Sequence, residues 1–191
     1  MSKRLSDYLR TLARQRTDQI VVATMQAAAY WPQLSDKDLD FKLIGCMGAA
    51  TPIGLGLALA QPQRRVLVCE GDGSLLMNLG VLATVAAQGL ANLVILVMDN
   101  GAYVTTGGQP VPGAGKVDLV AVARGAGIPR TYSFRDRAHF AGQLGRLLSV
   151  VGPVFARLDC SEPEPFVEVP PKPSAEEVAR RVRAALVGGS R

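Results

Sequence analysis

The stretch Arg65-Val66-Leu67-Val68-Cys69-Glu70-Gly71-Asp72-Gly73-Ser74 decides the fold of this chain. Its first part is a short run rich in Val and Leu that ends at turn residues, which predicts a buried β-strand. A second run of this kind spans Leu93–Met98, and the segment between them, Leu75–Gly89, has the length and the Leu, Met and Ala content of a helix. Strand, glycine turn, helix and strand form a βαβ unit with parallel strands. The sequence therefore predicts an α/β fold.

The glycine turn Gly71–Ser74 is the predicted functional centre. It places backbone N–H groups and a helix N-terminus at the carboxyl end of a strand, which suits an anion such as phosphate. Asp72 would repel a phosphate unless a cation lies between them, and Mg²⁺ binds carboxylate and amide oxygens together with phosphate oxygens. Adjacent parallel strands end side by side, so Asn100, after the next strand, can point at the same ion. The alternative is a plain Rossmann-like turn, with Asp72 capping the helix and Asn100 in a turn.

Two blocks of the sequence resemble those of thiamine diphosphate enzymes. The first is Gly71-Asp72-Gly73, followed after a helix and a strand by Asn100. In that family the block lies in the domain that binds the diphosphate of the cofactor through Mg²⁺. The second is Gly45-Cys46-Met47-Gly48, with the small-residue segment Ala49–Gly56 behind it and a similar spacing to the first block.

The resemblance covers most of the chain, from about Ile20 to about Cys160. Within the family, the segments Gly71–Gly80 and Thr105–Pro110 are most similar to the sulfopyruvate decarboxylase β subunit and the phosphonopyruvate decarboxylases. The resemblance implies a three-layer α/β/α fold with a mostly parallel sheet, the thiamine diphosphate-binding fold. Residues 1–191 would form a single diphosphate-binding domain, with a core at about 18–160 and a linker and helix at 161–191.

The resemblance also implies a set of site residues. The Gly45 carbonyl and the Met47 N–H would contact the aminopyrimidine ring, and the Met47 side chain would hold the cofactor bent. The N–H groups of Gly73 and Ser74 and the Ser74 hydroxyl would contact the diphosphate. The predicted cofactor contacts are Thr24, Gly45, Cys46, Met47, Gly71, Gly73, Ser74, Asn100, Ala102 and Tyr103, and the predicted Mg²⁺ ligands are Asp72, Asn100 and the backbone carbonyl of Ala102.

Some residues near these motifs are given other roles. Met25 and Gln26 follow Thr24 where members of the family usually have a glycine and polar residues, so the sequence departs from the pattern there. Glu70 is interpreted as a strand-end residue rather than a catalytic acid. Asp99 is expected beside the metal and not as a ligand. Asn78 either approaches the site or makes a structural hydrogen bond. The single histidine, His139, is expected to be solvated or packed rather than catalytic.

Three further features carry expectations. The predicted helix Thr51–Ala60 contains Gly54 and Gly56, which cost about 1 kcal/mol each relative to Ala, so another helix or a partner subunit is expected to pack close to it. Gly101–Gly115 is long enough for a lid over a site. Ser174 opens a predicted C-terminal helix with a capping box.

Composition narrows the classes of protein. Lys and Arg exceed Asp and Glu by 21 to 16, but the basic residues are scattered and not interleaved with aromatics, so nucleic acid is not the expected partner. No apolar run predicts a membrane span or the core of a signal peptide. The cysteines Cys46, Cys69 and Cys160 lie in or beside apolar runs and have no metal-ligand spacing. Reduced, buried thiols in a cytoplasmic protein are expected.

The chain is expected to hold half of an active site. Related enzymes activate the cofactor with a Glu from a separate pyrimidine-binding domain, and 191 residues leave no room for a second βαβ domain. The catalytic acid is therefore unknown in this chain and is expected on a second, pyrimidine-binding subunit, in an α₂β₂ or larger hetero-oligomer.

The expected reaction is decarboxylation of a small anionic 2-oxo acid, such as 3-sulfopyruvate or 3-phosphonopyruvate, to an aldehyde and CO₂. One alternative is another decarboxylase or a carboligase of the acetolactate synthase type, and a second is a non-catalytic cofactor-binding module. A dinucleotide-binding domain fits poorly, because no G-x-G-x-x-G turn opens a helix.

Overall fold

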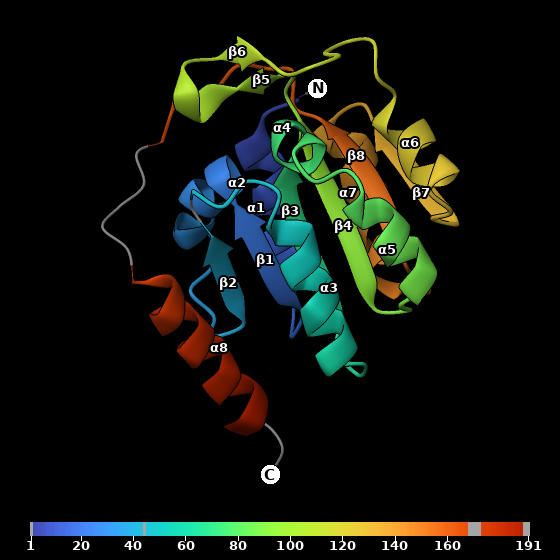
Figure 1. The fold of residues 1–191 in the computed structure, drawn as a ribbon. Helices are drawn as coiled ribbons and strands as arrows, with labels where there is room; N and C mark the ends of the chain where they lie inside the picture. Colours follow the sequence, from blue (N-terminus) through green and yellow to red (C-terminus); the bar gives the residue numbers. More distant parts are fainter. Residues whose placement is uncertain (1, 44, 168–172, 189–191) are drawn as a thin grey trace.

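The computed structural model describes residues 2–43, 45–167 and 173–188. Over these residues, six parallel strands form one sheet in the order β2-β1-β3-β4-β8-β7, with helices on both of its faces (Figure 1). The predicted α/β fold with a parallel sheet is confirmed. The strands are β1 Ile20–Thr24, β2 Asp40–Leu43, β3 Val66–Gly71, β4 Leu93–Asp99, β7 Arg130–Phe134 and β8 Val154–Asp159.

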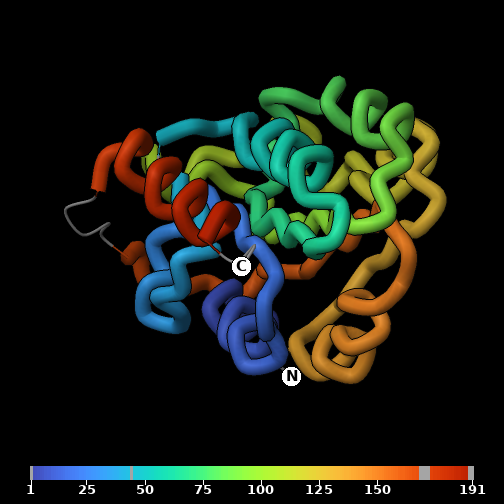
Figure 2. Tube along the Cα trace, turned by 90° about the horizontal axis from the view of Figure 1, so that it is seen from below, coloured from blue at the N-terminus to red at the C-terminus, as the bar shows by residue number. Residues whose placement is uncertain are grey.

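The helices form two layers, which Figure 2 shows on either side of the strands. α1, α2 and α7 pack on one face of the sheet, and α3, α5 and α6 pack on the other. The short α4 lies at the carboxyl edge, and the C-terminal α8 lies against the edge strand β2. The helices are α1 Leu5–Gln15, α2 Met25–Tyr30, α3 Ala50–Ala60, α4 Asp72–Leu76, α5 Val81–Gln88, α6 Leu119–Gly125, α7 Arg137–Ser149 and α8 Ala175–Gly188, with 3₁₀ turns η1 Trp31–Gln33 and η2 Val104–Thr106.

The strands are apolar on both faces because both faces are covered. Along β4, Val94 and Leu96 belong to the core under α1 and α7, whereas Leu93 and Ile95 belong to the core under α3 and α5. This alternation is the two-residue period of a strand. It explains why the strand sequences are continuous apolar runs rather than alternating ones.

The helix predicted at Leu75–Gly89 is wrong in its start and its continuity. The helical backbone begins at Asp72, directly after β3, and is interrupted at residues 77–80 before α5. The reason is local: Met77 and Asn78 donate their N–H groups to carbonyls three residues back, and the Asn78 side chain is tied to the Gly48 carbonyl. Gly89, with a φ of 58°, ends α5 in the left-handed conformation.

A short helix that the sequence did not predict follows β1. α2 runs from Met25 to Tyr30 and buries the alanines Ala27, Ala28 and Ala29 against the core. Trp31 is fully buried directly after it. A six-residue helix has too few turns to leave a periodic pattern, so packing rather than propensity decides it.

The close approach at helix α3 comes from the sheet. A Cβ added to Gly54 would lie 2.2 Å from Cγ2 of Val68 on β3. The expected helix or partner subunit is therefore not the reason for Gly54; a strand of the same chain is. At Gly56, which is exposed, an added Cβ would meet no atom of the described residues within 4 Å.

The amino end of the sheet contains a buried ion pair. At the amino end, the buried side chain of Arg16 forms an ion pair with the buried Asp40.

Helix α8 covers the edge strand β2 with Val178 and Val182, and Arg181 pairs with Asp36 and Asp38 beside it. Such cover protects an edge strand from pairing with other chains.

The C-terminal predictions agree with the structure where it describes them. Ser174 accepts a hydrogen bond from the Glu177 N–H at the start of α8, as the capping box predicted. Residues 168–172 of the predicted linker lie outside the described residues, as does Ile44. The assignment of 1–191 to a single diphosphate-binding domain stays a prediction.

Two further expectations concern the thiols and the membrane. Cys69 and Cys160 are buried, whereas Cys46 is exposed, so the expectation of three buried thiols is wrong for Cys46. Burial raises the pKa of the Cys69 thiol to about 12. No helix in the described part of the chain has the length and hydropathy needed to cross a membrane.

The packing of α3 on β3 gives a matched pair of substitutions. Gly54→Ala should destabilise the chain by about 1–3 kcal/mol through overpacking against Val68. Gly56→Ala should instead stabilise it by up to about 1 kcal/mol, because Ala has the higher helix propensity and the space is open. Urea unfolding followed by circular dichroism measures both. Equal stability of the two variants would contradict the packing described here.

Candidate active site

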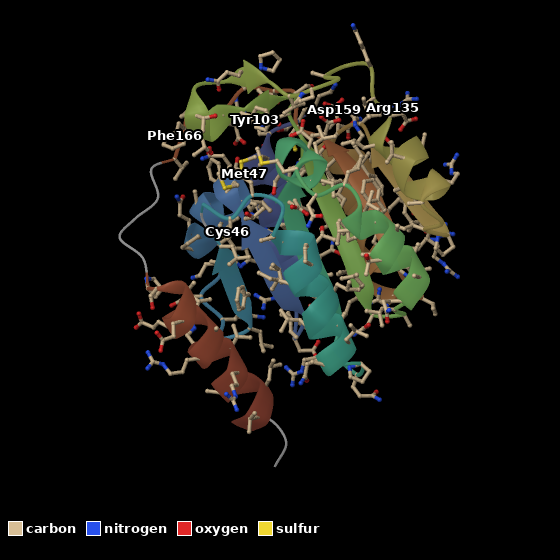
Figure 3. All side chains as sticks on the ribbon, viewed as in Figure 1. Cys46, Met47, Tyr103, Arg135, Asp159 and Phe166 are labelled. Atoms are coloured by element: carbon tan, nitrogen blue, oxygen red, sulfur yellow. The ribbon has the colours of Figure 1, made fainter. Side chains whose placement is uncertain are left out.

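A cleft lies at the carboxyl ends of β1, β3 and β4, and the β5–β6 hairpin (β5 Ala102–Tyr103, β6 Gln109–Pro110) forms part of its wall. Figure 3 shows Met47 and Tyr103 at this end of the sheet. Most of the predicted site residues meet here. The residues that line the cleft are Leu5, Thr24, Met25, Gln26, Ala27, Met47, Gly71, Asp72, Gly73, Ser74, Met98, Asn100, Ala102, Tyr103, Val104, Thr105 and Thr106.

The three predicted metal ligands lie together in the cleft. The Asp72 side chain is buried, and its Oδ2 accepts a hydrogen bond of 2.9 Å from the Gly101 N–H. Asn100 Oδ1 accepts one of 2.9 Å from the Ala102 N–H. Across the hairpin, the Val111 N–H donates to the Gly101 carbonyl, and Ala102 lies opposite Pro110. Ala102 is therefore the non-hydrogen-bonded residue of the pair, and its backbone N–H and carbonyl face away from β6. A carboxylate, an amide and a carbonyl oxygen are ligands that suit a hard cation such as Mg²⁺.

The electrostatics of the cleft favour such a cation. Burial, and then the neighbouring Asp99 carboxylate, raise the pKa of Asp72 to about 6. Asp99 in turn forms an ion pair with Arg157 on β8. The Asp99 carboxylate thus neighbours that of Asp72, and its place beside a metal stays a prediction. A divalent cation at Asp72 would offset the cost of holding this buried carboxylate ionised.

Arg157 is a residue near the site that sequence reasoning missed. It sits on β8 in register with Val97 of β4, two residues before Asp99 on the neighbouring strand. A charged residue within the otherwise apolar strand Val154–Leu158 was the available signal. A charge in a central parallel strand needs a partner nearby, and here that partner is Asp99.

The glycine at position 73 is required by its neighbours. A Cβ there would lie 2.4 Å from Cε1 of Tyr103 and 2.9 Å from Cγ1 of Val111. Tyr103 and Val111 therefore close directly onto the backbone of the glycine turn. This contact ties the hairpin to the turn, while contact between Tyr103 and a cofactor stays a prediction.

Thr24 supplies the observation that fits a ligand best. Its side chain is buried at the end of β1, and its Oγ1 has no hydrogen-bond partner among the residues that the structure describes. A buried hydroxyl without a partner costs about 1–3 kcal/mol. The next residue, Met25, has a φ of 50°, a conformation that favours glycine. Such costs collect at binding sites, and a diphosphate oxygen would give the hydroxyl its partner.

The Ser74 side chain is engaged differently from the prediction. Its hydroxyl donates to Oε1 of Glu70 at 2.7 Å and accepts from the Gly48 N–H at 2.9 Å. The single proton of the hydroxyl is therefore committed to Glu70 rather than free for a diphosphate. The Ser74 N–H stays a predicted contact. Glu70 is thus more than the strand-end residue that was expected, since it holds this side chain.

The loop Gly45–Gly48 reaches the cleft through Met47. Gly45 and Gly48 have φ values of 80° and 78°, which favour glycine. Asn78 donates to the Gly48 carbonyl at 2.9 Å, so the structure shows the structural hydrogen bond that was one of the two alternatives. Gly45 and Cys46 do not line the cleft, and their backbone contacts to a cofactor stay predictions.

The N-terminal segment forms another wall that the sequence did not reveal. Leu5 lines the cleft at the start of α1. Its position is held by contacts to the chain after β8: Lys3 pairs with Asp159, and Glu164 accepts from the Ser6 N–H. Pairs this distant in sequence leave no local signal.

His139 lies on α7 and does not line the cleft. Its ring is 5.0 Å from that of Phe134 in an edge-on contact, and the side chain is exposed. This agrees with a packing or solvated role.

The sequence of the chain is similar to those of known proteins. Residues 20–158 match the family model "Thiamine pyrophosphate enzyme, C-terminal TPP binding domain". The chain is 41% identical over 155 residues to the sulfopyruvate decarboxylase subunit beta of Methanothermobacter thermautotrophicus, and the match covers 80% of each protein. It is 39% identical over 182 residues to the phosphonopyruvate decarboxylase of Streptomyces viridochromogenes, which covers 95% of this chain and 45% of that protein.

Solved structures give the same result for the fold. The thiamine diphosphate-dependent 4-hydroxybenzoylformate decarboxylase of Rhodococcus jostii RHA1 superposes with a TM-score of 0.67 at 26% identity, over 83% of this chain and 33% of that one. The chain thus spans less than half of the phosphonopyruvate decarboxylase and a third of this enzyme. From the family match and the shared fold, the chain belongs to the thiamine pyrophosphate enzymes and corresponds to their C-terminal TPP binding domain.

Proposed function

We propose that this chain binds thiamine diphosphate through Mg²⁺ and forms the diphosphate-binding half of a 2-oxo acid decarboxylase. The observation that carries the proposal is the meeting of Asp72, Asn100 and Ala102 in the cleft, beside the unpartnered hydroxyl of Thr24. Membership of the thiamine pyrophosphate enzyme family supports it.

Each residue of the cleft has a task in this proposal. The carboxylate of Asp72, Oδ1 of Asn100 and the carbonyl of Ala102 would hold Mg²⁺. The N–H groups of the glycine turn and the hydroxyl of Thr24 would bind the diphosphate. When bound, thiamine diphosphate supplies the electron sink that lets a 2-oxo acid lose CO₂. The side chains of Met47 and Tyr103 would fill space and exclude water around it.

The proposed substrate is a small anionic 2-oxo acid such as 3-sulfopyruvate or 3-phosphonopyruvate, with an aldehyde and CO₂ as products. Support comes from relatives whose names state these two activities, at 39–41% identity. A carboligase is the second candidate, because the acetolactate synthase isozyme 1 large subunit of Escherichia coli is 31% identical over 140 residues. Analysis of the product from pyruvate or 3-sulfopyruvate, aldehyde against acyloin, separates the two.

A second subunit is part of the proposal. Among the described residues that line the cleft, Asp72 is the carboxylate, and it is assigned to the metal. The Glu that activates the cofactor would therefore come from a pyrimidine-binding partner. The relatives named as subunit beta, from Methanothermobacter thermautotrophicus and Methanocaldococcus jannaschii, support a two-subunit enzyme.

The metal assignment predicts the effect of Asp72→Asn. Loss of a residue that only hydrogen-bonds to a metal ligand lowers metal affinity by about 10–100-fold. Loss of a ligand itself should therefore weaken Mg²⁺-dependent binding of thiamine diphosphate at least about 100-fold. Isothermal titration calorimetry measures this directly. Asp18→Asn, at an exposed carboxylate outside the cleft, is the matched control and should bind as the wild type does. Unchanged binding by Asp72→Asn would refute the assignment.

The proposed half-site predicts that the chain forms a complex with a second subunit. Native mass spectrometry of the chain purified from its own cells, with thiamine diphosphate and Mg²⁺ present, should show a complex with a second, different subunit. That complex should decarboxylate a 2-oxo acid, and the separated chain should not. A homo-oligomer that turns over without a partner would overturn the half-site.

A further inference from the structure

Glu70 is a buried carboxylate to which the proposed chemistry gives no task. It is the penultimate residue of β3, and only 1% of its surface is exposed. Both carboxylate oxygens accept hydrogen bonds from hydroxyls, Oε1 from Ser74 and Oε2 from Thr51. Thr51 lies in the first turn of the 11-residue helix α3, where the N-cap Ala49 offers no side-chain cap. The Glu70 carboxylate therefore lies at the N-terminus of α3, where the helix dipole favours a negative charge.

The same carboxylate is the first link of a chain of bonds to the loop Gly45–Gly48. Because Glu70 takes the proton of the Ser74 hydroxyl, the lone pairs of that hydroxyl are left for the Gly48 N–H, which donates to it at 2.9 Å. The carbonyl of Gly48 accepts from the Asn78 side chain. Gly48 is thus held at both of its backbone polar groups, at its N–H by Ser74 of the glycine turn and at its carbonyl by Asn78 after α4.

The tight packing around Gly48 supports this reading. A Cβ at Gly48 would lie 3.1 Å from Cβ of Asn78, so the loop backbone touches the segment after α4 directly. Gly48 also has a φ of 78°, which a side chain would strain. Met47, the residue just before it, lines the cleft. The bonds that fix Gly48 therefore fix the entry of Met47 into the cleft.

We infer that Glu70 is a positioning residue: acting through the Ser74 hydroxyl, it locks the loop Gly45–Gly48 to the glycine turn and so sets Met47 at a fixed place relative to the diphosphate site. The inference rests on the proposed function for what binds in the cleft. It adds a physical link between the two halves of the site, the turn at Gly71–Ser74 and the loop before α3.

The surroundings of Glu70 separate this role from one in stability. Burial raises its pKa, which the bonds from Thr51 and Ser74 oppose, and no cation contacts its carboxylate among the ion pairs of the described residues. A buried carboxylate without a cation is costly. In Glu70→Leu the relief of burying a carboxylate offsets the cost of leaving the Thr51 and Ser74 hydroxyls without their acceptor, so global stability should change little while the loop is released. A purely structural residue would instead lose stability and loop protection together.

Hydrogen–deuterium exchange measures the lock without any ligand. In Glu70→Leu, peptides over residues 45–48 should exchange at least about tenfold faster, while those over β3 and β4 stay protected. Ser74→Ala should give the same local increase, and the double variant no further increase, because the two act in series. Thr51→Val is the control: it removes the other bond to Glu70 and leaves the Ser74–Gly48 bond, so residues 45–48 should stay protected. Glu70→Gln keeps one acceptor oxygen, so the exchange rate of residues 45–48 should lie between those of the wild type and Glu70→Leu. This variant replaces Glu70→Leu in the experiment if the leucine variant does not fold.

Binding then tests what the lock is for. Thiamine diphosphate and inorganic diphosphate, each with Mg²⁺, share the diphosphate half but not the rings. Glu70→Leu and Ser74→Ala should lose about tenfold or more in affinity for the first and less than about twofold for the second.

Each result has a defined meaning. Unchanged exchange of residues 45–48, or additive effects in the double variant, overturns the positioning role. Equal losses for both ligands overturn it as well, since they indicate damage to the diphosphate site. If the wild-type protein binds neither ligand, the proposed function fails, and the exchange data still decide whether Glu70 locks the loop.

Discussion

The register between β3 and β4 is the constraint on which the site depends. Gly71 pairs with Met98, so the turn that follows β3 lies beside the residues that follow β4. The bond from the Gly101 N–H to Asp72 closes this junction. A slip of one residue would send the side chains of one strand to the opposite face and separate Asp72 from Asn100. The extensive apolar packing on both faces of the sheet makes that slip costly, so the core fixes the geometry of the site.

The two ends of the sheet treat buried polar groups in opposite ways. At the amino end, the charges of Arg16 and Asp40 neutralise each other, although Nη2 of Arg16 has no hydrogen-bond partner among the described residues. At the carboxyl end, Thr24, Glu70 and Asp72 are buried without a direct cation partner in the described residues, while Arg157 serves Asp99. Natural proteins depart from local stability rules mainly at functional sites. The buried carboxylates without a cation partner thus lie at the end of the sheet that carries the cleft.

The features that the sequence predicted are those that depend on residues close together in the chain. The two predicted strands of the βαβ unit agree with β3 and β4 to within one residue at each end, because each is a short apolar run between turn signals. Asp72 and Asn100 were found because strand ends in a parallel sheet meet. The short helix α2, the break before α5 and the link from Glu70 to the loop were missed. Each depends on a partner distant in sequence, such as the Gly48 carbonyl for Asn78, and one sequence does not reveal such partners.

The hydroxyl of Thr24 and the left-handed Met25 have a consequence for ligand discovery. The unpartnered hydroxyl costs the folded chain free energy that a suitable ligand can return, and the strained backbone lies directly beside it. A compound that binds the folded state and not the unfolded one raises the free energy of unfolding by mass action, by about 2.7 kcal/mol at about 100 times its Kd. The melting curve of this chain is therefore a gauge of occupancy. A panel of phosphorylated compounds and divalent metals can be ranked by heating alone, before any substrate is known.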